Sequence, residues 1–123
     1  MQIDILTLFP PMFEGVFDYS MVKRARDKKL LDLKFTDLRE YSTDKYKSVD
    51  DRPYGGGAGM IMRVDIIDKA ISSIKDPRSK IILLDAGGEK FTQKMALQLS
   101  KVENLIIICG HYEGIDHRVH EHL

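Results

Sequence analysis

A glycine-rich stretch, Gly55 to Gly59, directly follows two carboxylates and an arginine in the sequence D-D-R-P-Y-G-G-G-A-G-M. Glycines lose much conformational entropy on ordering, so they are typical of places where backbone approaches a ligand or takes a positive φ. The stretch is no Walker A motif, because no Gly-Lys-Ser/Thr closes it, and no strand precedes it as in a dinucleotide fingerprint. It is either a flexible surface loop or a ligand loop in which Asp50 and Asp51 suit the donor face of guanine.

Two further glycine-containing loops follow apolar segments. The sequence D-A-G-G at 85–88 follows Lys80 to Leu84, and G-H-Y-E-G at 110–114 follows Asn104 to Cys109. In the second loop, Tyr112 offers a stacking face and Glu113 offers a hydrogen-bond acceptor. The second loop is also compatible with an ordinary turn between a strand and a helix. If the two apolar strands are neighbours, the loops form two walls of one cleft.

The histidines and the single cysteine are the remaining chemically versatile residues. All four histidines lie near the end of the chain, at positions 111, 117, 120 and 122. His117 and His120 would share a helix face, which makes a metal site conceivable, but a solvated helix end explains them more simply. We predict no metal site. Cys109 ends a strand without a base at motif spacing, so we predict a structural or pocket-lining thiol.

The elements that must position these residues alternate in type. Short apolar segments at 2–8, 31–36, 80–84 and 104–109 have the composition or alternation of strands. Apolar residues at helical spacing predict helices over 12–30, 64–75 and 92–101 and from 115 onward, with Thr92 as a cap. Residues 37–59 show no period and are expected to be a long polar loop. This order predicts an α/β domain with a largely parallel sheet flanked by helices, whose ligands bind beyond the carboxyl ends of the strands.

Composition narrows the class of protein. The length of 123 residues suits one domain. Basic residues (Lys and Arg) and acidic residues (Asp and Glu) each number 19, and this balance excludes a globally basic nucleic-acid coat protein. A basic cluster nevertheless stands at 23–29, where it is either a solvated helix face or a phosphate-contacting surface. One cysteine excludes a disulfide scaffold, and no apolar run approaches the ~18 residues of a membrane span. We therefore expect a cytoplasmic protein with no membrane partner.

Three motifs in this order resemble the bacterial tRNA (guanine-N1)-methyltransferase family of the SPOUT superfamily. They are I-L-T-L-F-P-P-M-F at 5–13, V-D-D-R-P-Y-G-G-G-A-G-M at 49–60 and C-G-H-Y-E-G-I-D at 109–116. Ala58 stands where many members have proline, and His111 stands where many have arginine. The resemblance covers all 123 residues, but only about the N-terminal half of a family member.

The resemblance implies a SPOUT-like, trefoil-knot methyltransferase domain that is incomplete, since the chain ends before the knot closes. Residues 1–123 are then the N-terminal part of that domain, and the family's C-terminal helical domain is absent. It further implies methyl transfer from S-adenosylmethionine to N1 of the guanine just 3′ of the tRNA anticodon. The partners implied are tRNA and a second copy of the intact enzyme, as a homodimer.

The resemblance also implies roles for individual residues. The expected cofactor-binding residues are Leu84, Asp85, Ala86, Gly87, Gly88, Gly110, His111, Tyr112, Glu113 and Gly114. The expected RNA-contacting residues are Asp50, Asp51, Arg52, Tyr54, Gly55, Gly56, Gly57 and Gly59. Glu113 is expected to support catalysis by holding the target base, or a magnesium ion with which the family is associated. The general base itself resembles an aspartate beyond Leu123, so we expect this chain alone to be inactive.

Two other functions remain compatible with the residues alone. One is a stand-alone RNA- or nucleotide-binding α/β module without catalysis. The other is a nucleotide-binding regulatory domain that has nothing to do with RNA. Binding of adenosylmethionine and of an anticodon stem-loop would separate these two possibilities.

Overall fold

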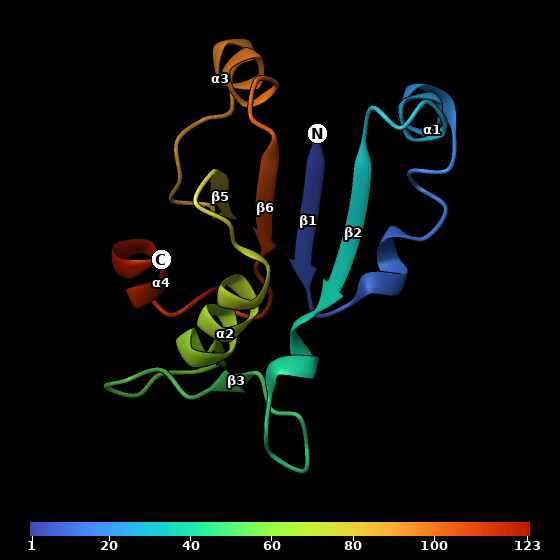
Figure 1. The fold of residues 1–123 in the computed structure, drawn as a ribbon. Helices are drawn as coiled ribbons and strands as arrows, with labels where there is room; N and C mark the ends of the chain where they lie inside the picture. The colour runs from blue at the N-terminus through green and yellow to red at the C-terminus, as the bar shows by residue number, and fades with distance from the viewer.

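The computed structural model describes residues 1–123, and its centre is a four-stranded sheet in the order β2-β1-β6-β5 (Figure 1). The strands are β1 (Gln2–Thr7), β2 (Asp32–Asp37), β5 (Ser79–Leu84) and β6 (Asn104–Cys109). Every pair in this sheet is parallel, so the carboxyl ends of all its strands meet at one edge. The predicted α/β class with a parallel sheet is confirmed.

The chain also forms four α-helices and two short 3-10 helices. The α-helices are α1 (Ser20–Asp27), α2 (Val64–Ile74), α3 (Gln93–Leu99) and α4 (Arg118–His122), and the 3-10 helices are η1 (Pro10–Phe13) and η2 (Leu38–Tyr41). The predicted cap is present, since the Thr92 hydroxyl accepts a hydrogen bond from the Met95 N–H at 3.3 Å. A small antiparallel pair, β3 (Asp50–Asp51) with β4 (Ile61–Met62), lies apart from the main sheet.

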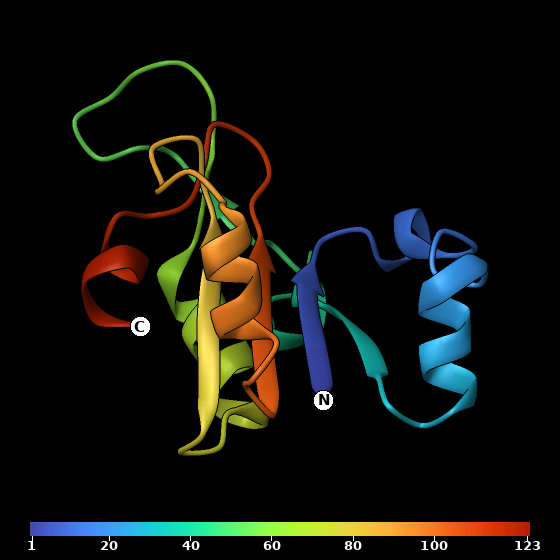
Figure 2. The same ribbon diagram turned by 90° about the horizontal axis from the view of Figure 1, so that it is seen from above.

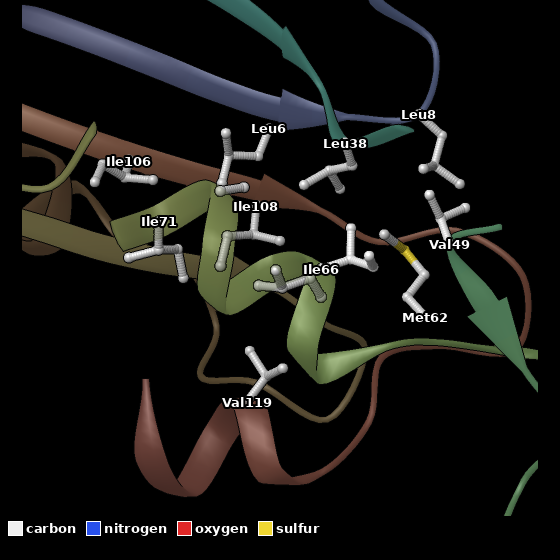
Figure 3. Close-up of a cluster of buried hydrophobic side chains, with 12 residues drawn as sticks. Leu6, Leu8, Leu38, Val49, Met62, Ile66, Ile71, Ile106, Ile108 and Val119 are labelled. Carbon is white, nitrogen blue, oxygen red and sulfur yellow. The ribbon is translucent and has the colours of Figure 1, made fainter. Parts of the chain in front are cut away.

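The hydrophobic core lies between the sheet and α2. The helix buries one stripe of residues, which is made up of Ile66, Ile67, Ala70 and Ile71. This stripe packs with Leu6 of β1 and with Ile106 and Ile108 of β6 in one cluster (Figure 3). Burying an isoleucine side chain contributes about 1.5–3 kcal/mol, so the three isoleucines of α2 fix the helix on the sheet.

The helix predicted over 12–30 is wrong in its first half. The structure has η1 at Pro10–Phe13 and begins α1 only at Ser20. Gly15 has a φ of 80°, and Ser20, the residue at which α1 starts, has a φ of 55°, so the backbone between η1 and α1 departs from right-handed helical geometry. The aromatic side chains of Phe13 and Phe17 instead stack near Phe35 of β2, at centroid distances of 5.3 and 5.9 Å.

The long polar loop predicted over 37–59 is also more structured than expected. Asp37 begins η2 by accepting a hydrogen bond from the Arg39 N–H at 2.9 Å. Leu38 and Val49 are 0% and 2% exposed and belong to the core cluster. They are isolated apolar residues in a polar segment, so no periodicity marks them as core residues.

The last helix begins later than predicted. Ile115 forms an isolated parallel bridge with Met62, and α4 starts at Arg118. Gly114, with a φ of 128°, keeps the preceding backbone out of helical geometry. The Asp116 carboxylate then accepts the Arg118 N–H at 3.0 Å, which begins the helix.

The basic cluster at 23–29 lies far from the carboxyl ends of the strands. Figure 1 and Figure 2 both show α1 on the β2 side of the sheet, and in Figure 1 it stands near the amino end of β1. The Met1 amino group donates to the Leu30 carbonyl at 3.2 Å, which fixes this end of the cluster beside the start of β1. Lys23 pairs with Asp27, and Arg26 pairs with Asp18. No helix has the length and apolar character needed to cross a membrane.

Candidate functional site

The glycine-rich loop and the loop after β6 are joined along their backbones. The Glu113 N–H donates to the Met60 carbonyl at 3.2 Å, and the Met62 N–H donates to the Gly114 carbonyl at 3.0 Å. The Asp116 N–H closes the series on the Met62 carbonyl at 3.1 Å. We call this series the 60–116 ladder. It brings together two segments that the sequence singles out separately.

Glu113 adds a side-chain bond to the 60–116 ladder. Its Oε2 accepts the Met60 N–H at 2.8 Å, while its other oxygen makes no hydrogen bond within the chain. Gly59, at a φ of 91°, passes so close that a Cβ placed there would stand 2.2 Å from the Glu113 carboxyl carbon. Glycine is therefore needed at position 59 both for its φ and for its lack of a side chain.

The outer part of the glycine-rich loop exposes its backbone. Gly55, Gly56 and Gly57 all have positive φ, at 87°, 85° and 123°, but no crowded neighbours. Apart from the Gly56 N–H, which donates to Pro53 at 3.2 Å, the N–H groups from Tyr54 to Gly59 find no partner within the chain. This loop therefore presents a row of donors to a ligand, as in other backbone anion or base sites.

The two carboxylates before the loop differ in their surroundings. Asp50 is half-buried in β3 opposite Met62, and its side chain accepts no hydrogen bond within the chain. Asp51 is exposed and accepts the Arg52 N–H at 2.7 Å. Asp50 therefore has acceptor capacity at the base of the glycine-rich loop, whereas Asp51 shapes the backbone that leads into it.

The loop after β5 lies beside the loop after β6, as predicted. Leu84 pairs with Cys109 at the ends of these strands, and a Cβ on Gly110 would stand 3.8 Å from the Leu84 carbonyl. Asp85 makes the turn, because its carboxylate accepts the Gly87 N–H at 2.7 Å and its carbonyl accepts the Gly88 N–H at 3.2 Å. The N–H groups of Ala86 and Tyr112 are exposed and have no partner within the chain. The two loops thus offer backbone groups at one edge of the sheet.

Aromatic rings line the third side of this edge. His111 lies edge-on to Phe9, which follows β1, at 5.0 Å, and to Tyr112 at 5.1 Å. Tyr112 has a φ of 59°, a left-handed conformation that costs a non-glycine residue about 1 kcal/mol or more. Its surroundings impose this conformation, since the Gly114 N–H donates to the His111 carbonyl at 3.3 Å across the turn.

Arg118 is the residue at this site that sequence reasoning missed. Its guanidinium donates to both carboxylate oxygens of Asp116, at 2.9 and 2.6 Å, and lies 5.7 Å from the centre of the Tyr54 ring. The hydrogen bonds from Arg118 lower the pKa of the largely buried Asp116 carboxyl. The spacing D-x-R is the only signal in the sequence, and it is too common to be specific. Arg118 connects the glycine-rich loop to α4.

A cleft of about 360 Å³ opens between these residues and the start of α2. Its lining comprises Asp51, Arg52, Tyr54, Ile61, Arg63, Val64, Asp65, Asp116 and Arg118. Two of the arginines are held in fixed orientation, since Arg63 contacts both oxygens of Asp65 at 3.0 and 2.8 Å, as Arg118 does with Asp116. Arg52, by contrast, has no side-chain partner in the chain and is available to a ligand.

The histidines and the cysteine form no second site. His117 and His120 share a face, with ring centres 5.4 Å apart, but no group of three or more His, Cys, Asp or Glu side chains converges. His120 instead approaches the Asp85 carboxylate, with 3.9 Å between Nε2 and Oδ2. Burial raises the pKa of the Cys109 thiol, which makes it a weaker nucleophile at neutral pH.

The chain is similar to known proteins along its whole length. The family model described as "tRNA (Guanine-1)-methyltransferase TrmD" matches residues 1–123. A protein of Dictyoglomus turgidum named "tRNA (guanine-N(1)-)-methyltransferase" is 51% identical over 97% of this chain and 49% of its own length. A protein of the same name from Porphyromonas gingivalis is 50% identical over 100% of this chain and 56% of its own length. The chain thus spans about half the length of the curated relatives it matches.

Proposed function

The chain belongs to the tRNA (guanine-1)-methyltransferase family, and on that premise we propose that it forms part of the site for methyl transfer to tRNA. The reaction proposed is transfer of the methyl group of S-adenosylmethionine to N1 of the guanine just 3′ of the anticodon. The observation that carries this proposal is the 60–116 ladder. It joins the glycine-rich loop, which suits a guanine, to the loop after β6, which suits the cofactor. Methyl transfer requires two reactants to meet in line, and such positioning supplies a large part of the rate.

The loops at 84–88 and 110–114 fit the cofactor. Their exposed backbone groups, which include the N–H of Ala86 and of Tyr112, suit an adenine edge and ribose hydroxyls. Gly110 leaves room for the turn after β6 to fold back, because a Cβ there would stand 3.3 Å from the Ile115 side chain. When bound, the cofactor supplies an electrophilic methyl group on a sulfonium centre.

The glycine-rich loop supplies the guanine side of the proposed site. Its row of N–H donors suits the acceptor oxygen of guanine, and Asp50 suits the N–H groups on the same edge of the base. The target base must leave the anticodon stack to present this edge. Tyr54, which is 88% exposed, and Arg52 are then available to neighbouring nucleotides.

Glu113 is a positioning residue in this proposal. One of its oxygens holds the Met60 N–H, so it fixes the glycine-rich loop, and the other remains for the base or a magnesium ion. N1 of guanine carries a proton at neutral pH, so a general base is needed. We assign that base to no residue of 1–123 and propose that it lies in the remaining length found in the relatives. The 123-residue chain alone is then inactive, and a homodimer of the longer protein is the proposed assembly.

The test is a methylation assay on the full-length protein encoded by the gene. Labelled S-adenosylmethionine is supplied with tRNA that carries guanine, or adenine as the control, just 3′ of the anticodon. We expect label only in the guanine tRNA, as 1-methylguanosine after digestion. Binding of tRNA and cofactor without transfer would instead favour a binding module. Light scattering of the same preparation measures whether it is a dimer.

A further inference from the structure

A rigid polar turn lies at the same end of the molecule as the proposed site, and the methyl transfer proposed above does not use it. Residues 42–48, with the sequence S-T-D-K-Y-K-S, follow η2 and are called here the Asp44 turn. Lys45, Tyr46 and Lys47 are all exposed, and Tyr46 is 84% exposed. A single exposed aromatic residue is ordinary on a protein surface. The order lysine, tyrosine, lysine at the tip of a rigid turn is not accounted for by the core.

The Asp44 carboxylate makes the turn rigid. It accepts hydrogen bonds from the Ser42 hydroxyl and the Tyr46 N–H, both at 2.8 Å, and from the Ser48 N–H at 3.1 and 3.2 Å. These bonds lower the pKa of Asp44 to about 2. Lys47 is held at a φ of 52°. The turn therefore presents Tyr46 between two lysines without having to order on binding, which preserves affinity.

The Asp44 turn lies at the edge of the molecule where the proposed site is. It follows the carboxyl end of β2, and Figure 1 shows it beyond the arrowheads of the strands, with β3 and the glycine-rich loop. Asp44 is 3.9 Å from the Arg63 guanidinium, which also lines the cleft beside Tyr54. The basic cluster on α1, by contrast, stands near the amino end of β1. A nucleic acid bound at the glycine-rich loop would thus lie at the same end of the molecule as the Asp44 turn, and away from the basic cluster.

We propose that the Asp44 turn is an RNA-contacting element: the Tyr46 ring stacks on an unpaired base, and the Lys45 and Lys47 ammonium groups contact flanking phosphates. This inference rests on the proposed function, since it takes tRNA as the substrate. Aromatic rings stack on any base, and flanking cations neutralise the backbone on either side. An acidic peptide would need the lysines but would gain little from the face of the ring.

The experiment measures binding and methylation of a tRNA transcript with guanine 3′ of the anticodon, using the full-length protein. Tyr46→Ala is compared with Tyr46→Phe, because phenylalanine keeps the stacking face. We expect Tyr46→Ala to weaken binding roughly 5- to 150-fold, the range that stacking on one base supplies, while Tyr46→Phe binds as the parent does. The loss is in KM rather than kcat, because the contact lies away from the reacting atoms.

A second comparison isolates the charges. Lys45→Gln with Lys47→Gln removes two positive charges from the Asp44 turn, and Lys28→Gln with Lys29→Gln removes two from the basic cluster at the end of α1. We expect the slope of log K against log salt to fall by about 1.4–1.8 for the first pair, at ~0.7–0.9 per phosphate contact. The second pair should change the slope less. The amide signal of Ser48 shows whether each variant keeps the turn intact.

The outcomes separate this inference from the proposed function. If the parent protein methylates the tRNA but Tyr46→Ala binds as tightly as Tyr46→Phe, the inference is overturned and the function stands. An equal or larger slope change from the pair at positions 28 and 29 would also overturn it. If the parent neither binds nor methylates the tRNA, the proposed function itself fails.

Discussion

Replacement of Gly59 by alanine is the sharpest test of the site. The new Cβ would stand 2.2 Å from the Glu113 carboxyl carbon, so the carboxylate must swing away from the Met60 N–H. The side chain is flexible, so the steric cost is small. The lost charge-assisted hydrogen bond is worth about 1–2 kcal/mol, near the low end of its range because it is exposed. The left-handed φ of 91° adds about 1–2 kcal/mol for an L-residue.

The expected loss of stability is therefore about 2–4 kcal/mol by urea unfolding, and the fold should persist. The catalytic effect should be larger than this stability loss suggests, because a misplacement of ~1 Å can reduce the rate about 100-fold. The assay is kcat for tRNA methylation by the full-length protein, measured beside its unfolding curve.

Gly56→Ala is the matched control. Gly56 has a similar φ of 85°, but a Cβ placed there would have no atom within 4 Å, so this variant isolates the backbone strain from the contact with Glu113. In a Glu113→Ala background, Gly59→Ala should cost markedly less than in the parent, since its target is gone. Equal effects at positions 59 and 56, or strict additivity with Glu113→Ala, would refute the reasoning.

Three further predictions follow from contacts outside the loop. Arg118→Gln should raise the pKa of Asp116 toward its ordinary value. The lowered pKa stabilises the fold above the ordinary pKa of the carboxyl, and this stabilisation is lost as the pH falls through the pKa of the folded state, so the variant should unfold in acid at a higher pH. An unchanged midpoint of acid unfolding would contradict this. Leu38→Ala should lower the free energy of unfolding in urea by about 2–5 kcal/mol, since Leu38 is 0% exposed. A loss close to zero would show that Leu38 is an exposed loop residue. The Asp44 carboxyl should titrate at about pH 2 by NMR, so the turn keeps its bonds above pH 3.8 and loses them as the pH falls through 2; titration near 3.8 would show that the turn is open in solution.

The sequence predicts the regular elements where one periodicity dominates. The apolar stripe of α2 and the continuous apolar run of β6 are both found where expected. The helix expected from Met12 fails because Gly15 adopts a positive φ and the phenylalanines pack toward β2. Leu38 is missed because one apolar residue in a polar segment carries no period, although it lies fully inside the core.

For the candidate site, the sequence predicts which loops lie together but not the hydrogen bonds that join them. The loops after β5 and β6 lie together as expected, because parallel strands end at one edge. The contact between Met60 and Glu113 spans 53 positions, and no local pattern encodes such a pairing. The bidentate hold of Arg118 on Asp116 is equally invisible until the fold is known. The roles of these residues in binding remain predictions.

The position of β1 has a consequence for the order of folding. The strand that is synthesised first, β1, is central in the sheet. Its Ile5 pairs with Ile107 of β6, so this pairing can form only after residue 107 has been synthesised. Contacts between residues so distant in sequence form slowly, because a long segment of chain must close first. The 60–116 ladder depends on residues that follow β6, so the glycine-rich loop should be among the last parts to order. In pulsed hydrogen exchange, the Met62 amide should gain protection no earlier than the amides of β6. A nascent chain would carry an exposed, half-paired β1 until nearly all of these residues had left the ribosome.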